Sequence, residues 1–188
     1  MAETQRVLNS VEALKALAHP LRQQMLHRLR QQGSATSAIL AVEFGVDRGA
    51  ASYHLRQLHR FGFIEDDAER SAGRRRFWRA VAQDLRLPPV SPDPEVNLAV
   101  DEIVGHWRGR AERSLTNFAA HRQEFGAFAD AAMASYSDAS LTAEELAQFT
   151  EEYIAFVQRW QRDPQAAPTD ARHITILFYA FPTSEPSV

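Results

Sequence analysis

Apolar residues recur at helical spacing through the first part of the chain, and helix-breaking residues divide them into separate segments. Val11, Leu14 and Leu17 fall on one face of a helix that ends before Pro20. Proline suits the first turn of a helix because it has no N–H group to leave unpaired. A second helix is therefore predicted from Pro20 to about Gly33.

Two further helices are predicted next, each preceded by a residue that can cap it. Thr36 can cap a helix that stops at Gly45, and Asp47 can cap a helix over residues 47–61. The predicted buried stripe of this last helix is Ala51, Leu55 and Leu58. The opposite face of the same helix is left for solvent or for a partner.

Strand-like residues after Gly62 predict a β-hairpin. Two apolar-containing segments, residues 63–65 and 74–81, flank a polar stretch that contains Gly73. This stretch is longer than a tight turn, so the tip of the hairpin is expected to be an extended loop.

A proline-rich segment separates the two halves of the chain. Four prolines stand between residues 88 and 94, and this arrangement disfavours helix and favours an extended spacer. We therefore expect a first domain over residues 1–86, a linker over residues 87–96 and a second domain over residues 97–188.

The second domain is expected to be mostly helical and to end in one strand. Apolar positions at helical spacing predict a helix from Asn97 to about Tyr136. Thr142 and Glu145 form a capping-box pattern that predicts the start of the next helix. The apolar, β-rich segment 174–181 predicts a strand. The expected fold class is mainly α with a small β-hairpin.

A short helix, a glycine turn and a second helix with small residues at its start are typical of a helix-turn-helix. In that motif the second helix offers its outward residues to base edges in the major groove of DNA. Gly49 and Ala50 leave room for close approach. The outward residues that can bond to phosphates or bases are Arg48, Ser52, Tyr53, Arg56 and Gln57. An ordinary solvated basic face is the alternative, and it does not explain the small-residue start.

The hairpin that follows is expected to be a wing that contacts the minor groove or nearby phosphates. Its candidate DNA-binding residues are Arg74, Arg75 and Arg76. The acidic residues on the other side of the loop, which would repel phosphate, are Asp66, Asp67 and Glu69. A hairpin whose charges pair internally is therefore the alternative.

These motifs resemble those of the ArsR-type winged helix-turn-helix regulators, in particular a subgroup with a longer helical C-terminal extension. The resemblance rests on LKALAHPLR at 14–22, SYHLRQL at 52–58 and GRR at 73–75, and it covers roughly residues 9–82. It implies a homodimeric transcription regulator, usually a repressor, that binds an inverted repeat in double-stranded DNA. It places Arg48, Ser52, Tyr53 and Arg56 on the recognition helix, and the three arginines of the hairpin on the wing. It also implies that His54 packs within the domain and does not read bases.

The chain departs from that family in having no cysteine. Disulfides are excluded, and so is the thiolate metal site that the family carries on its third helix, here around residues 38–44. Imidazole and carboxylate groups could still bind zinc or nickel, but scattered surface histidines explain their spacing better. The residues considered are Asp101, His106, His121, Glu124 and His173. No metal and no cofactor is expected.

Charge differs between the two halves of the chain. Residues 1–82 hold 13 Lys and Arg against 8 Asp and Glu, whereas residues 83–188 hold 8 against 16, within a net charge of -3. This asymmetry suggests that only the first half meets a polyanion, although random variation of surface charge would also explain it.

Aromatic residues concentrate in the second half. One interpretation is a pocket for a small apolar effector, with Trp107, Phe118, Phe125, Tyr153, Phe156 and Trp160 as candidate lining residues. The favoured interpretation is an aromatic core with a dimer interface, because aromatic stripes at helical spacing usually pack. The second domain is therefore expected to serve dimerisation, sensing, or both.

Other classes of function find little support. No phosphate-binding glycine loop, nucleophile elbow or metalloprotease motif appears, so an enzyme is not expected. The start of the chain lacks a signal-peptide pattern, and no apolar run approaches the ~20 residues of a membrane span. A soluble cytoplasmic protein without membrane partners is expected. A winged-helix protein-interaction module that binds no DNA stays open as an alternative.

Overall fold

The structure is a computed structural model of the 188-residue chain, and it describes residues 6–8, 10–71, 75–81, 85–88, 90–161 and 167–183. The chain forms two compact units. The N-terminal unit comprises Met1–Trp107 and Arg162–His173, and the C-terminal unit comprises Arg108–Gln161 and Ile174–Val188.

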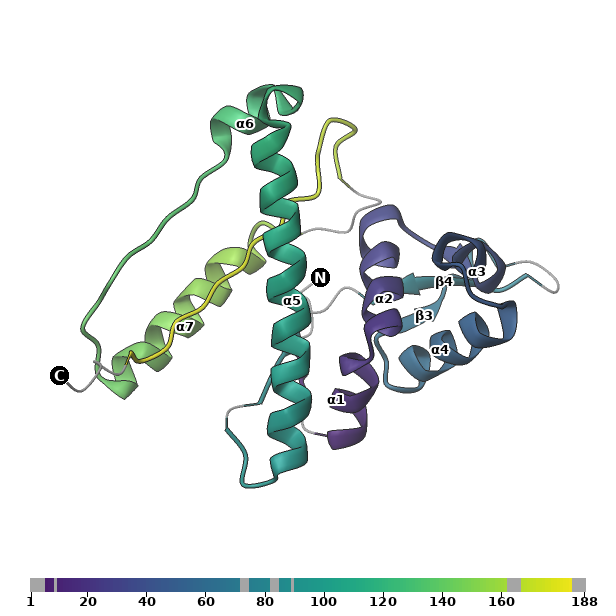
Figure 1. The fold of residues 1–188 in the computed structure, drawn as a ribbon, viewed down its shortest axis with the longest axis horizontal. Helices are drawn as coiled ribbons and strands as arrows, with labels where there is room; N and C mark the ends of the chain where they lie inside the picture. The colour runs from purple at the N-terminus through teal and green to yellow at the C-terminus, as the bar shows by residue number, and fades with distance from the viewer. Residues whose placement is uncertain are drawn as a thin grey trace. The chain divides into compact units, whose positions relative to one another are not determined.

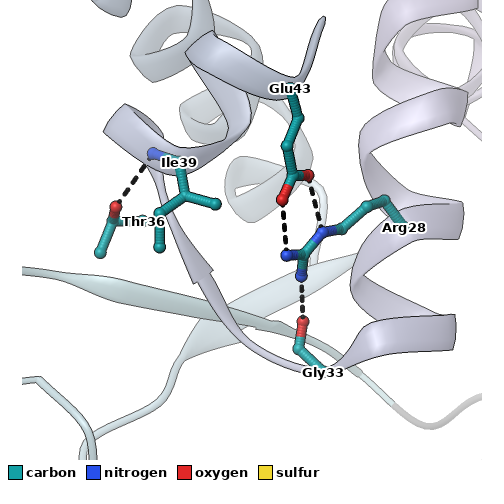
Figure 2. Close-up of polar contacts among 5 residues, drawn as sticks. All are labelled: Arg28, Gly33, Thr36, Ile39 and Glu43. Atoms are coloured by element: carbon teal, nitrogen blue, oxygen red, sulfur yellow. Dashed lines mark hydrogen bonds and ion pairs between the residues drawn. The ribbon is translucent and has the colours of Figure 1, made fainter.

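The N-terminal unit begins with the four short helices that the apolar pattern predicts. They are α1 (Val11–Ala18), α2 (Pro20–Gln32), α3 (Ser37–Phe44) and α4 (Arg48–Arg60) (Figure 1). Polar side chains fix where these helices begin. The hydroxyl of Thr36 accepts a hydrogen bond from the backbone N–H of Ile39 (3.2 Å; Figure 2), and the carboxylate of Asp47 accepts one from that of Ala50 (2.8 Å). Both predicted caps are confirmed.

A small antiparallel sheet completes the first unit, with strand order β2-β4-β3. Its strands are β2 (Ala35–Thr36), β3 (Ile64–Asp66) and β4 (Phe77–Ala80). The β3–β4 pair confirms the predicted hairpin, and its register sets Ile64 opposite Ala80 and Asp66 opposite Trp78. A separate parallel pair joins β1 (Arg6–Val7) to β5 (Leu85–Arg86).

The core of this unit lies among the helices, the sheet and the first part of helix α5 (Pro94–Ala120). Its most deeply buried side chains include Leu14, Leu17, Met25, Leu40, Leu55, Leu58, Phe63 and Ile103, each at most 1% exposed. Burying one such side chain stabilises the fold by about 1.5–3 kcal/mol. This core therefore holds α4 in place from its inner side.

Helix α5 begins at Pro94, within the segment predicted as a linker. A proline at the first helical position leaves no N–H group unpaired, so the prolines bar helix only before this point. The carboxylate of Asp93 accepts a hydrogen bond from the backbone N–H of Glu95 (2.9 Å) and helps to start the helix. The last residues of the predicted linker are thus helical, and the division at residues 87–96 stays a prediction.

The C-terminal unit departs from the predicted single helix over residues 97–136. Helix α5 ends at Ala120, and a 3₁₀ turn (Arg122–Phe125) and the short helix α6 (Ala127–Ala131) follow. Gly126 stands between them with a φ of 53°, a left-handed conformation that an α-helix cannot accommodate. The prediction of one continuous helix was therefore wrong beyond Ala120.

Helix α7 (Ala143–Gln158) starts at the predicted capping box. Thr142 accepts a hydrogen bond from the backbone N–H of Glu145 (3.2 Å), and Glu145 accepts one from that of Thr142 (2.8 Å). The predicted strand over residues 174–181 is wrong, because this segment is irregular and has no ladder partner among the described residues. It runs beside α7 (Figure 1). The ring of Phe178 stacks on that of Tyr153, with ring centroids 3.8 Å apart.

None of the described helices is long and apolar enough to cross a membrane.

Candidate nucleic-acid interface

Helix α4 is held to the core by one face only. Ala51, Leu55 and Leu58 are each 0% exposed, as the apolar stripe predicts. Gly45 ends α3 in a left-handed conformation with a φ of 64°, and two residues later Asp47 caps α4. Helices α3 and α4 are thus joined by a short turn that contains a glycine, which is the geometry of a helix-turn-helix.

The opposite face of α4 carries the side chains predicted to meet DNA. Arg48, Tyr53 and Arg56 are exposed, whereas Ser52 and Gln57 are partly buried. Within the described parts of the chain, neither Arg48 nor Arg56 makes a hydrogen bond or an ion pair. Both guanidinium groups are therefore available to an anionic partner, and Tyr53 adds a half-exposed ring beside them.

The small residue at position 49 has a structural role in addition to leaving room for a partner. A Cβ atom at Gly49 would lie 2.9 Å from the carboxylate oxygen of Asp47 that caps the helix. A larger residue at this position would displace the cap. Glycine here favours the cap at Asp47, and the case for DNA binding rests on the outward side chains.

His54 packs inside the unit, as the resemblance implies. Its ring lies 4.6 Å from the ring of His19 and 5.3 Å from that of Tyr53, measured between centroids. Burial lowers the pKa of His54, and the nearby His19 and Arg22 lower this pKa further. Burial followed by the charge of Arg22 also lowers the pKa of His19. Both imidazoles are accordingly neutral at pH 7, and His54 contributes packing to this face.

The hairpin arginines predicted to form the wing have different environments. Arg74 lies outside the described residues, and Arg75 is exposed. Arg76 forms an ion pair with Asp66, with 2.7 Å between Nε and Oδ2, and its guanidinium carbon lies 4.2 Å from the ring centroid of Trp78. The charge of Arg76 is therefore already compensated within the hairpin.

Other arginines of the hairpin are also engaged within the unit. Arg70 donates to the hydroxyl of Ser34 (3.0 Å), and Arg79 forms an ion pair with Glu65 (2.7 Å). Asp67, one of the three acidic residues expected to repel phosphate, is only 2% exposed and is therefore hidden from solvent. In the described part of the hairpin, the alternative of internal pairing applies to every arginine except Arg75.

Two further residues in the last turn of α4 share its exposed basic surface, and the sequence pattern did not single them out. His59 and Arg60 are both exposed, and Arg60 follows Arg56 by one helical turn. The ring of His59 lies 5.1 Å from that of Trp78 between centroids and so links the helix to the hairpin. The i, i+4 spacing from Arg56 was the signal that could have found Arg60.

The residues proposed to line an effector pocket do not form one cluster in the C-terminal unit. Phe118 pairs with Phe125 at 5.1 Å between ring centroids, while Tyr153 stacks on Phe178. Phe156 and Trp160 are 51% and 65% exposed. Trp107 belongs to the N-terminal unit, where it packs on the core. The pocket stays a prediction.

The structure also bears on the histidines and carboxylates considered as metal ligands. Among the described residues, no three His, Asp or Glu side chains lie close enough together to hold a metal ion. His106 and His173 lie in the N-terminal unit, and His121 and Glu124 in the C-terminal unit.

Comparison with known proteins agrees with this geometry. Residues 17–67 match a family model described as a helix-turn-helix domain, and this span contains α2, α3, α4 and β3. No curated protein matches the chain. The predicted helix-turn-helix is thereby confirmed.

Several solved structures are similar to this chain. One is the homodimeric winged helix-turn-helix DNA-binding domain of a possible ArsR-family transcriptional regulator from Mycobacterium bovis, at 26% identity over 50% of this chain and 75% of that chain, with a TM-score of 0.34. Another is a possible transcriptional regulator for arsenical resistance, at 24% identity over 56% of this chain and 95% of that one, with a TM-score of 0.33. A transcriptional regulator from Thermotoga maritima is 12% identical over 79% and 85% of the two chains, also with a TM-score of 0.33. The winged helix-turn-helix fold of residues 10–81 itself follows from the helices, the turn and the hairpin described above.

Proposed function

We propose that this chain is a DNA-binding transcriptional regulator of the ArsR type whose helix α4 enters the major groove. One observation carries the proposal. The inner face of α4 is fixed by three fully buried residues, while Arg48 and Arg56 on its outer face have no partner in the described parts of the chain. A cationic face held rigidly on a helix-turn-helix is suited to phosphates and guanine edges.

The side chains on the outer face of α4 can contact different groups of the DNA. Arginine can donate two parallel hydrogen bonds to the O6 and N7 atoms of guanine, and it can also bind a phosphate. Ser52 and Gln57, being partly buried, can reach only groups that come close to the helix. Arg75 adds an exposed cation on the hairpin.

The regulator acts as a homodimer that reads an inverted repeat. A two-fold axis would set two α4 helices about one turn of DNA apart, which matches the symmetry of such a repeat. The C-terminal unit is suited to form the contact between subunits. None of the described residues of α7 is buried, and large apolar side chains such as Phe149, Phe156 and Trp160 are exposed. Binding of the dimer over a promoter would repress transcription.

Selection of duplexes from a random pool by the purified chain at defined salt, followed by footprinting, tests this proposal. Enrichment of an inverted repeat with half-sites about one helical turn apart is the expected result. A pool that shows no enriched sequence would instead favour a protein-interaction module. Enrichment of a single half-site would argue against the dimer.

A further inference from the structure

Trp78 is the centre of a side-chain cluster that joins the hairpin to the end of α4. It is 5% exposed, and its ring contacts both the imidazole of His59 and the guanidinium of Arg76. Asp66 stands opposite Trp78 in the strand register. The cluster comprises Asp66, Ser71, Arg76 and Trp78.

Asp66 organises this cluster through both of its carboxylate oxygens. Oδ2 accepts a hydrogen bond from Nε of Arg76 (2.7 Å), and Oδ1 accepts one from the hydroxyl of Ser71 (2.6 Å). Ser71 in turn accepts a hydrogen bond from the backbone N–H of Phe77 (2.9 Å). The hydrogen bond from Ser71, and next the one from Arg76, hold the pKa of Asp66 below its usual range. Asp66 therefore stays ionised at neutral pH and compensates the charge of Arg76.

The hairpin has a second ion pair, which lies on the other face of the sheet. Side chains alternate between the faces of a strand, so Glu65 points away from the side of Ile64 and Asp66. Ile64 is 1% exposed and faces the core, and Trp78 contacts His59 of α4 from this same side. The Asp66–Arg76 pair thus lies on the face that carries the recognition helix, whereas the Glu65–Arg79 pair lies on the opposite face.

We propose that Asp66 is a specificity-determining residue, whose carboxylate engages Arg76 and so suppresses a sequence-independent contact between the hairpin and DNA phosphate. This inference rests on the proposed DNA binding. A phosphate contact raises affinity for every sequence alike and adds nothing to discrimination. A regulator must find its site among a large excess of other sequences. A hairpin arginine that does not bind phosphate leaves non-specific binding weaker, and so raises the ratio of specific to non-specific binding.

Both partners are accessible to solvent, with Arg76 52% and Asp66 37% exposed. A phosphate can therefore reach Arg76, but it must bind beside the Asp66 carboxylate, whose negative charge repels it. Arg48 and Arg56 have no such competitor within the described residues. The two groups of arginines should consequently make different contributions to the salt dependence of binding.

The substitution Asp66→Asn tests the proposal, because asparagine keeps the shape and can still accept the hydrogen bond from Ser71. We expect the affinity for a random-sequence duplex to rise about five- to tenfold near 0.1 M salt, and the slope of log K against log salt to steepen by about 0.9, as for one added phosphate contact. Arg76→Ala should change this affinity less than about twofold in the native background. Combined with Asp66→Asn, it should abolish the gain.

Glu65→Gln is the matched control, since it removes one negative charge and one arginine partner on the opposite face of the same hairpin. Its effect on the slope should be less than about half that of Asp66→Asn. An equal effect, a gain that persists in the double variant, or an unchanged slope in Asp66→Asn would overturn the proposal. If circular dichroism shows that Asp66→Asn is unfolded, the variant Asp66→Ser provides the same test. The variant Arg56→Ala distinguishes a failure of the proposed DNA binding from a failure of the proposed role of Asp66. A loss in that variant together with no effect of Asp66→Asn refutes only the role of Asp66.

Discussion

Arg28 and Glu43 form a two-pronged ion pair that ties α2 to α3. Nε and Nη2 of the arginine each donate to one carboxylate oxygen at 2.8 Å, and Nη1 donates to the backbone carbonyl of Gly33 at 3.0 Å (Figure 2). The side chains are 16% and 35% exposed, so solvent screens this pair less than it screens the hairpin pairs. The pair fixes the helix that precedes the turn into α4.

Arg28→Ala should lower the free energy of unfolding by about 1–2 kcal/mol, because a paired carboxylate and a loop carbonyl lose their donors. Arg28→Lys should lie between the native chain and Arg28→Ala, since lysine keeps the charge but loses the fork. Urea unfolding of both variants, with Glu43→Ala and the double variant, measures the coupling. Strictly additive losses in the double variant would show that the pair contributes nothing.

Gly49→Ala should not gain the stability that alanine usually adds to a helix. Its Cβ would lie 2.9 Å from the carboxylate of Asp47, and a lost cap costs about 1 kcal/mol. Gly105→Ala in α5 is the control, because a Cβ there would have no neighbour within 4 Å. That variant should gain about 0.5–1 kcal/mol. Thermal melts should show a higher melting temperature for Gly105→Ala than for Gly49→Ala, and an equal gain in both variants would refute the cap explanation.

The stability of the chain should fall as pH drops below neutrality. Burial and the neighbouring charges lower the pKa of His19 and of His54 from the ordinary value of 6.5. Below about pH 6.5 the unfolded chain therefore binds protons that the folded chain does not, and the free energy of unfolding decreases until the lowered pKa values are passed. Above pH 7 both states are unprotonated at these residues, and the effect vanishes.

The variant His54→Phe isolates this contribution, because it removes one titrating group and fills the same space. Urea unfolding at pH 7.5, 6.5 and 5.5 should show a smaller loss of stability on acidification than in the native chain. His121→Gln, on an exposed histidine, should leave the native profile in place. A His54→Phe profile parallel to the native one would contradict the assignment.

The exposed apolar surface of α7 should be required for dimerisation. Phe156 is 51% exposed and Trp160, just past the end of α7, is 65% exposed, so Phe156→Glu would set a charge within the proposed contact between subunits. Sedimentation should show that this variant is a monomer, and circular dichroism should show that its helix content is unchanged. Ala155→Glu adds the same charge next to it on the helix, between Glu151 and Arg159, and should stay dimeric. A Phe156→Glu dimer of native affinity would place the interface elsewhere.

Local signals in the sequence predicted the fold best where one residue decides the outcome. The caps at Thr36, Asp47 and Thr142 each involve a side chain and an N–H group three residues apart, so the sequence contains the whole interaction. The buried stripe of α4 was equally predictable, because the helical period alone sets which residues face inward.

The errors arose where the outcome depends on distant partners. Residues 174–181 have strand propensity, but a strand also needs an edge to pair with, and propensity does not supply one. One error had a local cause instead, because helical spacing continues past Ala120 in the sequence while Gly126 has a φ of 53°, a conformation that glycine adopts readily. The pairing of Arg76 with Asp66 likewise depends on the register of β3 and β4, which no spacing along the chain reveals.

The salt dependence of binding to a selected duplex, measured for the native chain and for Arg56→Ala, tests whether the outer face of α4 binds double-stranded DNA. We expect a linear fall of log K with log salt for the native chain. For Arg56→Ala we expect weaker binding, a slope shallower by about 1 and an unchanged melting temperature, because this exposed side chain makes no hydrogen bond or ion pair among the described residues. Identical affinity and slope for the two proteins would contradict the claim.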